Sequence, residues 1–457
     1  MTRKDLFARS LASHVRQAHG EQAAATFDRS SSIGEPRGYA PTGNLALNRA
    51  MGTPGIPLGR ITEISGWEAA GKSTCLDQIL AATQKIGGLC VLADTERARN
   101  RAYMAALGVQ PESLIWIGGR TVEAMFDEIE TLARTASHYN ALAWYEALVR
   151  EGIKTPPPPK YKYTIWDKSG IRKKAIVSYD FCQWQRGQAA ALYEFQKAKG
   201  LPCTGMRDQE SRELLNPVIL YGKDNAENKE ALKHWLEGTP TPLAQPADRP
   251  IVIGWDSVAG TATEAELEGA AQDVHVATAA KVIRRNLRRL IQLIDDEAIA
   301  MILINQRYEK LNIGGSFSWG KQSETYGGGG IKYHSTIRVE LDRVGAIFGA
   351  GAKKANGDPP CGQEVLIKVP KNKLNDPHRT EKYGLIFGRG AVDSWTIYND
   401  LKDRGIIHAG GGGWSKFTDP GILKEDKSFR GWTELEELME KDDDLIQNLT
   451  DLYMEGK

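Results

Sequence analysis

A glycine-rich loop between an apolar strand and a helix is the feature that most limits what this chain can fold into. The loop consists of Gly66, Trp67, Glu68, Ala69, Ala70, Gly71, Lys72, Ser73 and Thr74. A G-x4-G-K-S pattern in this context is typical of a P-loop, because its glycines let backbone amides turn inward around phosphate oxygens. The N-terminus of the following helix adds partial positive charge. The loop therefore predicts an α/β fold that binds the phosphates of a nucleotide.

Three residues have the chemistry that a Mg²⁺–ATP site requires. Lys72 is expected to neutralise the terminal phosphates, and the Ser73 hydroxyl is expected to be a ligand of Mg²⁺. A second acid after an apolar strand commonly holds the metal shell, and Asp256 ends the strand-like run I-V-I-G-W-D. The expected cofactors are ATP and Mg²⁺.

Hydrolysis also needs a base that positions water. Glu96 follows the strand-like segment L-C-V-L-A-D-T and is the first candidate, while Asp94 of the same strand end is an alternative. Gln306 ends the apolar run A-M-I-L-I-N and is placed to contact the terminal phosphate and respond to its loss.

Alternating strand and helix patterns predict the architecture. They occur over residues 59–134 and again from residue 251, which indicates a mostly parallel sheet with antiparallel strands late in the chain. The predicted divisions are an N-terminal helix and linker for docking between protomers (1–40), a core (41–137 and 249–395), an inserted module (138–248) and a small C-terminal α/β domain (396–457). The module interleaves cations and aromatics around residues 160–174, which leaves open an auxiliary DNA patch, a partner surface or a decorating domain.

Composition excludes some classes of function. The 59 Lys and Arg nearly balance the 58 Asp and Glu, so nucleic acid cannot be bound by bulk positive charge and needs a local patch. No apolar run approaches about 18 residues, so no membrane span or membrane partner is predicted. The five cysteines are scattered and odd in number, which favours a reducing, cytoplasmic setting over a disulfide framework.

Several segments in order resemble the RecA recombinase family. They include T-G-N-L-A-L-N-R-A-M before the P-loop, L-G-R-I-T-E-I-S-G-W-E-A-A-G-K-S-T across it, and L-A-D-T-E-R-A-R-N-R-A-Y-M-A-A-L-G-V after it. W-D-S-V-A-G-T-A-T-E-A-E-L-E-G, L-I-N-Q and V-P-K-N-K-L follow later in the chain. The resemblance covers about residues 40–135 and 250–390. It implies a RecA-like P-loop ATPase that forms a helical filament on single-stranded DNA, pairs it with homologous double-stranded DNA and exchanges strands.

The resemblance assigns roles to further residues. Glu96 matches the catalytic glutamate, Tyr103 the aromatic that stacks on adenine, and Gln306 the switch glutamine. Lys371 and Lys373 match lysines that reach the ATP of a neighbouring protomer. Two departures stand out: Ala69 and Ala70 replace a pair of small hydroxyl residues, and Asn100 stands where the family often has an Asp facing the adenine amino group.

Two segments are predicted to bind DNA. The basic stripe consists of Lys281, Arg284, Arg285, Arg288 and Arg289, at helical spacing on the segment Val274–Glu297. Alone this is most simply a solvated face, but it follows a stretch that resembles the first DNA-binding loop of the family. The second loop begins directly after Gln306, and its glycines would make it mobile while an aromatic wedges between bases. The contact residues predicted in it are Gly314, Gly315, Phe317, Trp319, Tyr326, Gly327 and Gly328.

The leading hypothesis is therefore a DNA-dependent ATPase and recombinase. One alternative is a hexameric DNA helicase, which shares this core but translocates along DNA. The other is a regulatory DNA-binding ATPase that does not exchange strands.

Overall fold

The structure is a computed structural model that describes residues 34–150, 152–154, 191, 194–200, 250–268, 276–309, 323–349, 354–423 and 428–456. The predicted N-terminal helix and most of the predicted inserted module lie outside these residues. None of the helices in the described part is long and apolar enough to cross a membrane.

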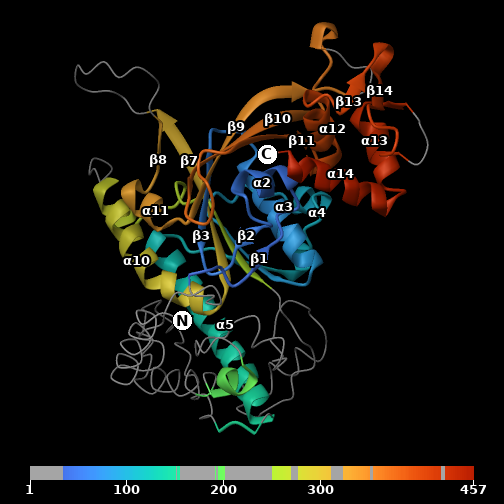
Figure 1. Ribbon diagram of the computed structural model, residues 1–457. Coiled ribbons are helices and arrows are strands. Elements are labelled where there is room, and N and C mark those ends of the chain that lie inside the picture. The colour runs from blue at the N-terminus through green and yellow to red at the C-terminus, as the bar shows by residue number, and fades with distance from the viewer. Residues whose placement is uncertain are drawn as a thin grey trace, which may run out of the picture.

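One large sheet forms the centre of the molecule (Figure 1). Its strands are β3 (Ile61–Gly66), β4 (Leu89–Asp94), β5 (Leu114–Ile117), β6 (Ile251–Asp256), β7 (Ile299–Glu309), β8 (Ser323–Thr325), β9 (Ile337–Ile347), β10 (Gly362–Asn372), β11 (Thr380–Ile386) and β12 (Gly390–Val392). The order is β12-β11-β10-β9-β3-β7-β6-β4-β5, and β8 pairs with β7. The strands from β9 to β5 in this order pair in parallel, whereas β10, β11 and β12 pair antiparallel. The prediction of a mostly parallel α/β sheet is confirmed.

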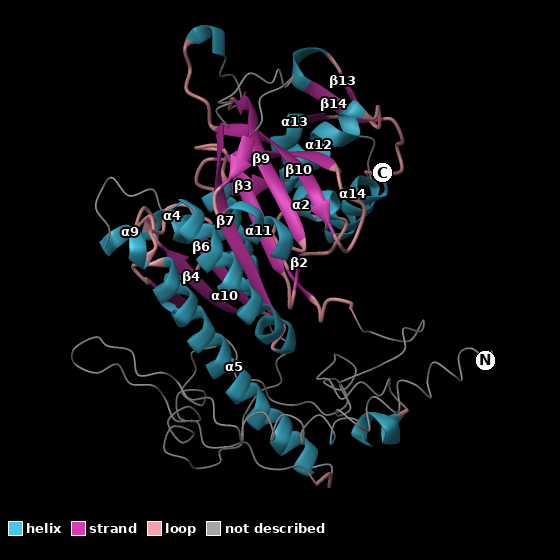
Figure 2. Cartoon of the chain, turned by 90° about the vertical axis from the view of Figure 1, so that its left-hand side faces the viewer, coloured by secondary structure: helices cyan, strands magenta, loops and turns pink. Residues whose placement is uncertain are grey.

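Helices cover both faces of the sheet, so its central strands are buried on both sides. One face carries α2 (Leu45–Met51), α3 (Lys72–Lys85) and α4 (Arg101–Ala106), and the other carries α5 (Val122–Arg150), α10 (Val276–Asp296) and α11 (Gly328–His334) (Figures 1 and 2). Strand β6 shows the alternation that this requires. Val252 packs in the core cluster beneath α3, while Ile251, Ile253 and Trp255 pack in the cluster beneath α5 and α10.

The remaining elements are short or belong to the C-terminal unit. The short ones are β1 (Tyr39–Ala40), β2 (Ile56–Pro57), α9 (Glu264–Glu268) and the 3-10 turns at Pro111–Ser113, Lys354–Asn356 and Gly411–Gly413. The C-terminal unit comprises α12 (Asp393–Asp403), β13 (Ile407–Ala409), β14 (Trp414–Phe417), β15 (Phe429–Arg430), α13 (Gly431–Met439) and α14 (Asp443–Glu455). It has its own apolar core, which includes Phe417, Phe429 and Leu449.

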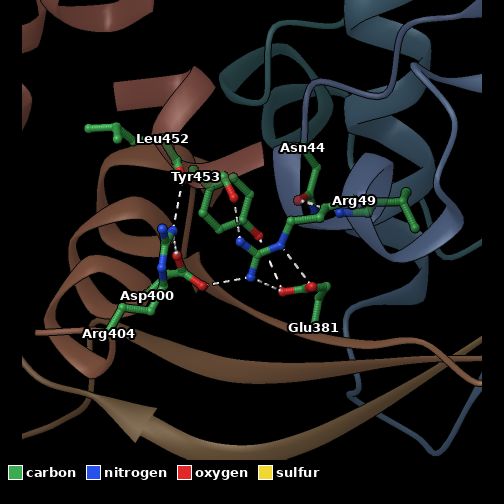
Figure 3. A network of polar contacts seen from close by, with 8 residues as sticks. Asn44, Arg49, Glu381, Asp400, Arg404, Leu452 and Tyr453 are labelled. Carbon is green, nitrogen blue, oxygen red and sulfur yellow. Dashed lines mark hydrogen bonds and ion pairs between the residues drawn. The ribbon is translucent and has the colours of Figure 1, made fainter. Parts of the chain in front are cut away.

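A buried arginine joins this C-terminal unit to the core (Figure 3). The Arg49 guanidinium of α2 donates to both oxygens of Glu381 on β11 and to Asp400 Oδ1 on α12. It also donates to the Tyr453 carbonyl and lies 3.7 Å from the centre of that residue's ring. A single side chain thus ties the first helix of the core to the last helix of the chain.

Two elements differ from their predicted limits. The alternating pattern was expected to end at residue 134, before a module that starts at residue 138, but α5 continues to Arg150. The apolar run A-M-I-L-I-N ends before Gln306, but β7 continues to Glu309, because Arg307 pairs with Thr325 and Glu309 with Ser323 of β8. The second loop therefore cannot begin directly after Gln306, and that part of the prediction is wrong.

Candidate nucleotide and DNA sites

The P-loop lies where β3 meets α3. Gly66 must be glycine because a Cβ there would approach the Leu341 carbonyl oxygen to 2.5 Å. Gly71 adopts φ 88°, a left-handed conformation that glycine accepts without strain. Ala69 also has a positive φ, at 56°, and the Gln363 side chain of β10 donates to its carbonyl. Strand β10 thus supports the outer part of the loop.

Lys72 and Ser73 begin α3, directly below the loop. The Lys72 ammonium donates to the Trp67 carbonyl across 2.7 Å, so it is held over the cradle that the loop forms. Burial lowers the pKa of Lys72, although Asp256, Glu96 and Glu68 oppose this effect. A partly desolvated ammonium beside three carboxylates gains favourable interactions when phosphates approach it, which fits the predicted role.

Ser73 and Asp256 meet at the carboxyl end of β6. The Ser73 hydroxyl donates to Asp256 Oδ2 across 2.7 Å. Mg²⁺ prefers oxygen ligands and is usually held by one or two protein groups together with substrate phosphates. This hydroxyl–carboxylate pair beside the P-loop fits Mg²⁺. Burial raises the pKa of Asp256, and the neighbouring Arg99 opposes that rise.

Glu96 lies beyond β4 at the same edge of the sheet. Its Oε1 accepts hydrogen bonds from the Ser257 hydroxyl at 2.5 Å and from the Gln306 side-chain amide at 2.9 Å. Asp94, the alternative base, instead caps a turn by accepting from the Arg97 backbone amide. The geometry brings Glu96 and Gln306 together and gives Asp94 a structural contact.

Strand β7 connects Gln306 to the segment before α11. The side chain of Asn305 accepts from the Gln306 amide and donates both to Glu63, buried in β3, and to the Tyr326 carbonyl. Glu63 is also paired with Arg338 of β9. Gln306 therefore lies in a continuous polar network rather than at a free strand end.

The predicted adenine-binding residues lie on α4. Tyr103 is 37% exposed and is available for stacking. Asn100 is the N-cap of α4, and its side-chain oxygen accepts from the Tyr103 amide. Asn100 therefore positions the helix that carries Tyr103, and its oxygen keeps a second lone pair for a further hydrogen bond.

Lys371 and Lys373 lie at the opposite edge of the sheet from their own P-loop. Both features can be placed along β9. Lys371, near the end of β10, pairs with Arg338 near the start of β9. Gly66, at the start of the P-loop, pairs with Leu341 further along β9. The Lys371 ammonium donates to the carbonyls of Lys332 and Tyr333 at the end of α11. Burial, and then the nearby Lys373 and Arg338, lower the pKa of Lys371.

The basic stripe is present on the exposed face of α10. Lys281, Arg284, Arg285 and Arg288 are exposed, and within the described residues no ion pair involves any of these four. Arg289 is different, because it bonds Glu130 of α5 at 2.8 Å. The apolar side of α10, including Ile283 and Leu287, packs on the sheet.

His334 lies between the basic stripe and the lysines at the end of β10. His334 of α11 has its pKa lowered by burial and then by Arg288, Arg284, Lys373 and Lys371. Cations from α10 and β10 therefore act on one side chain between them.

The second loop is only partly within the described residues. Gly314, Gly315, Phe317 and Trp319 lie outside them. Tyr326 is partly buried against the cluster beneath α10, and burial raises its pKa. Gly327 caps α11 and Gly328 is its first residue. The prediction that these glycines belong to a mobile loop is therefore corrected: they begin a helix that packs on α10.

Sequence patterns alone did not single out two residues of the nucleotide site. Ser257 directly follows Asp256, so the end of that strand was a signal for it. Arg99 contacts Asp77 and Asp256, and nothing in the local sequence pattern distinguishes it from neighbouring arginines.

The sheet topology and the glycine-rich loop between β3 and α3 are typical of P-loop α/β proteins. The family model described as the RecA N-terminal domain matches residues 13–139 and 247–392, more than half of the chain. The protein belongs to the RecA family.

Relatives agree with this assignment at low identity. The chain is 26% identical over 377 residues to the DNA repair protein recA homolog 3, mitochondrial, of Arabidopsis thaliana, with 81% of this chain and 60% of that protein covered. It is 24% identical to Protein RecA of Chlamydia felis, covering 83% of this chain and 73% of the relative. Protein RecA of Fusobacterium nucleatum is 24% identical, with 86% and 72% covered. The chain thus spans less than two thirds of the plant protein.

Proposed function

We propose that this protein is an ATP-dependent DNA recombinase that forms a helical filament on single-stranded DNA, pairs it with a homologous duplex and promotes strand exchange. Family membership and relatives named RecA support the recombination role. The observation that carries the proposal is the hydrogen bond between Gln306 and Glu96. It joins a carboxylate beside the P-loop to the strand that leads into the second loop.

Hydrolysis is assigned to residues at the carboxyl edge of the sheet. The loop amides and Lys72 hold the phosphates of ATP, and Ser73 with Asp256 holds Mg²⁺, which supplies charge neutralisation at the phosphates. Glu96 orients the attacking water and accepts its proton. Tyr103 stacks on the base.

The two lysines after β10 act on a neighbouring protomer. They lie at the sheet edge opposite their own P-loop, and Lys371 is fastened there by carbonyls of α11. In a filament that stacks protomers head to tail, this edge faces the next nucleotide site. Positive charge supplied in trans stabilises the transferring phosphoryl group, as an arginine finger does. Hydrolysis would then depend on assembly.

DNA is assigned to the basic stripe and the second loop. Four exposed cations on α10 provide backbone contacts that are salt-dependent and sequence-independent. The network from Glu96 through Gln306 and Asn305 to Tyr326 gives a physical route between the two sites. A change in Glu96 contacts on hydrolysis would alter the strand from which the loop extends.

Electron microscopy with single-stranded DNA and a non-hydrolysable ATP analogue tests the proposal. A helical filament is expected. Closed six-membered rings would favour the helicase alternative, and failure to assemble would favour a regulatory ATPase. Lys72→Ala is the control, because it removes the phosphate-binding ammonium and should prevent nucleotide-dependent assembly while leaving the fold intact.

A further inference from the structure

The side chain of Arg99 joins three parts of the nucleotide site. It lies between Glu96 and α4, and its side chain is only 11% exposed. One terminal nitrogen donates to Asp77 Oδ1 at 2.5 Å and to the Ser73 carbonyl at 3.1 Å, and the other donates to Asp256 Oδ2 at 2.6 Å. The guanidinium therefore connects the first turns of α3 to the end of β6.

The buried ion pairs of Arg99 with Asp77 and Asp256 are not explained by a contribution to the stability of the fold alone. The side chains of Asp77 and Asp256 are 2% and 6% exposed, and burial raises the pKa of Asp77 to about 6. The desolvation of buried ions offsets most of their attraction, so apolar residues of similar volume are often as stable or more so. A stabilising role alone gives no reason to place three charges here.

The location of the contact indicates its role. Asp256 Oδ2 accepts from two donors, Ser73 and Arg99. With Ser73 alone, the carboxylate can still swing about its last side-chain torsion, because a single hydrogen bond restrains Oδ2 relative to one donor only. Arg99 supplies the second donor, and Asp77 holds the guanidinium from its far side.

We propose that Arg99 is a positioning residue for the Mg²⁺–nucleotide site. It fixes the Asp256 carboxylate in the orientation that the metal shell requires. The same residue precedes Asn100, the cap of the helix that carries Tyr103, so it also links the metal side of the site to its base-binding side. This inference rests on the proposed ATP site and does not depend on strand exchange.

The test measures the Mg²⁺ dependence of binding of a fluorescent ATP analogue, so its readout is independent of turnover. Arg99→Leu should raise the half-saturating Mg²⁺ concentration about 10- to 100-fold, the usual cost of removing a residue that orients a metal ligand. It also leaves Asp77 buried without its partner and should lower thermal stability. In Arg99→Leu/Asp77→Leu both members of that pair are gone and only Asp256 still lacks the guanidinium, so part of the stability should recover while the raised Mg²⁺ requirement persists.

Two further variants complete the test. Arg101→Leu is the matched control, because this arginine is 76% exposed in the same segment, and it should leave the Mg²⁺ requirement unchanged. Arg99→Lys keeps a buried cation but lacks the planar guanidinium, so it should raise the Mg²⁺ requirement several-fold. This variant tests the proposal if the leucine variants do not fold.

The contrary outcomes are distinct. A wild-type Mg²⁺ requirement in the folded double variant, or in Arg99→Lys if the double variant does not fold, would overturn the proposal and leave Arg99 as a structural ion pair. Absence of nucleotide binding by the unaltered protein would instead contradict the proposed function, and the role of Arg99 would fall with it.

Discussion

The side-chain amide of Gln306 donates to Glu96 Oε1 across 2.9 Å. Gln306 lies on β7 and Glu96 follows β4, so the bond links the two strands that flank β6 in the sheet. The same oxygen accepts from Ser257, which follows β6. Three neighbouring strands thus converge on one carboxylate oxygen. Any movement of Glu96 toward water or phosphate must rearrange the contacts of β7, from which the second loop extends.

Glu96→Gln is expected to lower ATP hydrolysis about 10²- to 10⁴-fold, since a positioned general base contributes that much. The amide keeps the size of the side chain and can still accept from Ser257, so affinity for a fluorescent ATP analogue should remain within a few-fold. Single-turnover hydrolysis and nucleotide titration measure the two effects separately. Asp94→Asn is the matched variant; if it abolished hydrolysis while Glu96→Gln did not, Asp94 would be the base.

Lys373→Ala should abolish DNA-stimulated hydrolysis and leave ATP binding nearly intact, because the lysine lies at the sheet edge opposite its own P-loop. A mixing experiment makes the test sharp. Glu96→Gln protomers cannot hydrolyse ATP at their own site but still bind it and supply Lys373, so adding them to Lys373→Ala protomers should restore part of the activity. Loss of ATP binding in Lys373→Ala, or no recovery on mixing, would mean that the lysine does not act across an interface.

The sequence was sufficient to predict the central strands and the residues at their ends. β4 and β6 were recognisable because each is a short apolar run that ends in a carboxylate, and Asp94, Glu96 and Asp256 follow from that ending. The P-loop was recognisable because its glycines are required by close backbone contacts, such as that between Gly66 and Leu341.

What could not be predicted depends on partners distant in the chain. Arg99 and Asp256 are 157 positions apart, and periodicity reports whether a residue is buried but not which residue it meets. The extension of β7 depends on pairing with β8 after an intervening loop. The run Gly327–Gly330 suggested mobility, yet at Gly330 a Cβ would lie 3.1 Å from the Arg284 Cβ. These glycines permit close packing of two helices.

Replacing Lys281 and Arg288 together with Gln should weaken binding to single-stranded DNA and flatten its salt dependence. Removing one cation from a DNA phosphate reduces the slope of log affinity against log salt by about 0.7 for a single strand. Arg289→Gln is the control, because that side chain is bonded to Glu130 and should change the slope less. Fluorescence anisotropy at several salt concentrations measures the slopes, and equal slopes in all three proteins would exclude the stripe from DNA binding.

Arg49→Met should destabilise the attachment of the C-terminal unit. Removing one partner of a buried ionic network costs about 3–5 kcal/mol, because Glu381 and Asp400 would be left without the guanidinium that they share. Urea unfolding and limited proteolysis should show early release of residues after β12. Arg389→Met breaks a surface pair with Glu436 and should cost no more than about 1 kcal/mol. Similar losses in both variants would contradict a special role for Arg49.

Asp393 should make stability depend on pH. It begins α12, where its carboxylate accepts from the Leu45 backbone amide, and burial raises its pKa to about 6 from an ordinary value of 3.8. Between these values the unfolded chain has released the proton while the folded chain still holds it. The contribution of this group to stability therefore falls as pH rises from about 4 to about 6, and it stays low above that range.

Asp393→Asn removes this titration while its side-chain oxygen can still accept from Leu45. The free energy of unfolding of the variant minus that of the unaltered protein should rise between about pH 4 and pH 6. The total rise should be about 2–3 kcal/mol, after which the difference levels off, since each unit of pKa shift corresponds to about 1.4 kcal/mol. Urea unfolding at intervals from pH 4 to pH 8 measures this difference and cancels the titration of groups common to both proteins. A difference that stays constant across the range would show that Asp393 ionises in the folded protein as readily as in water.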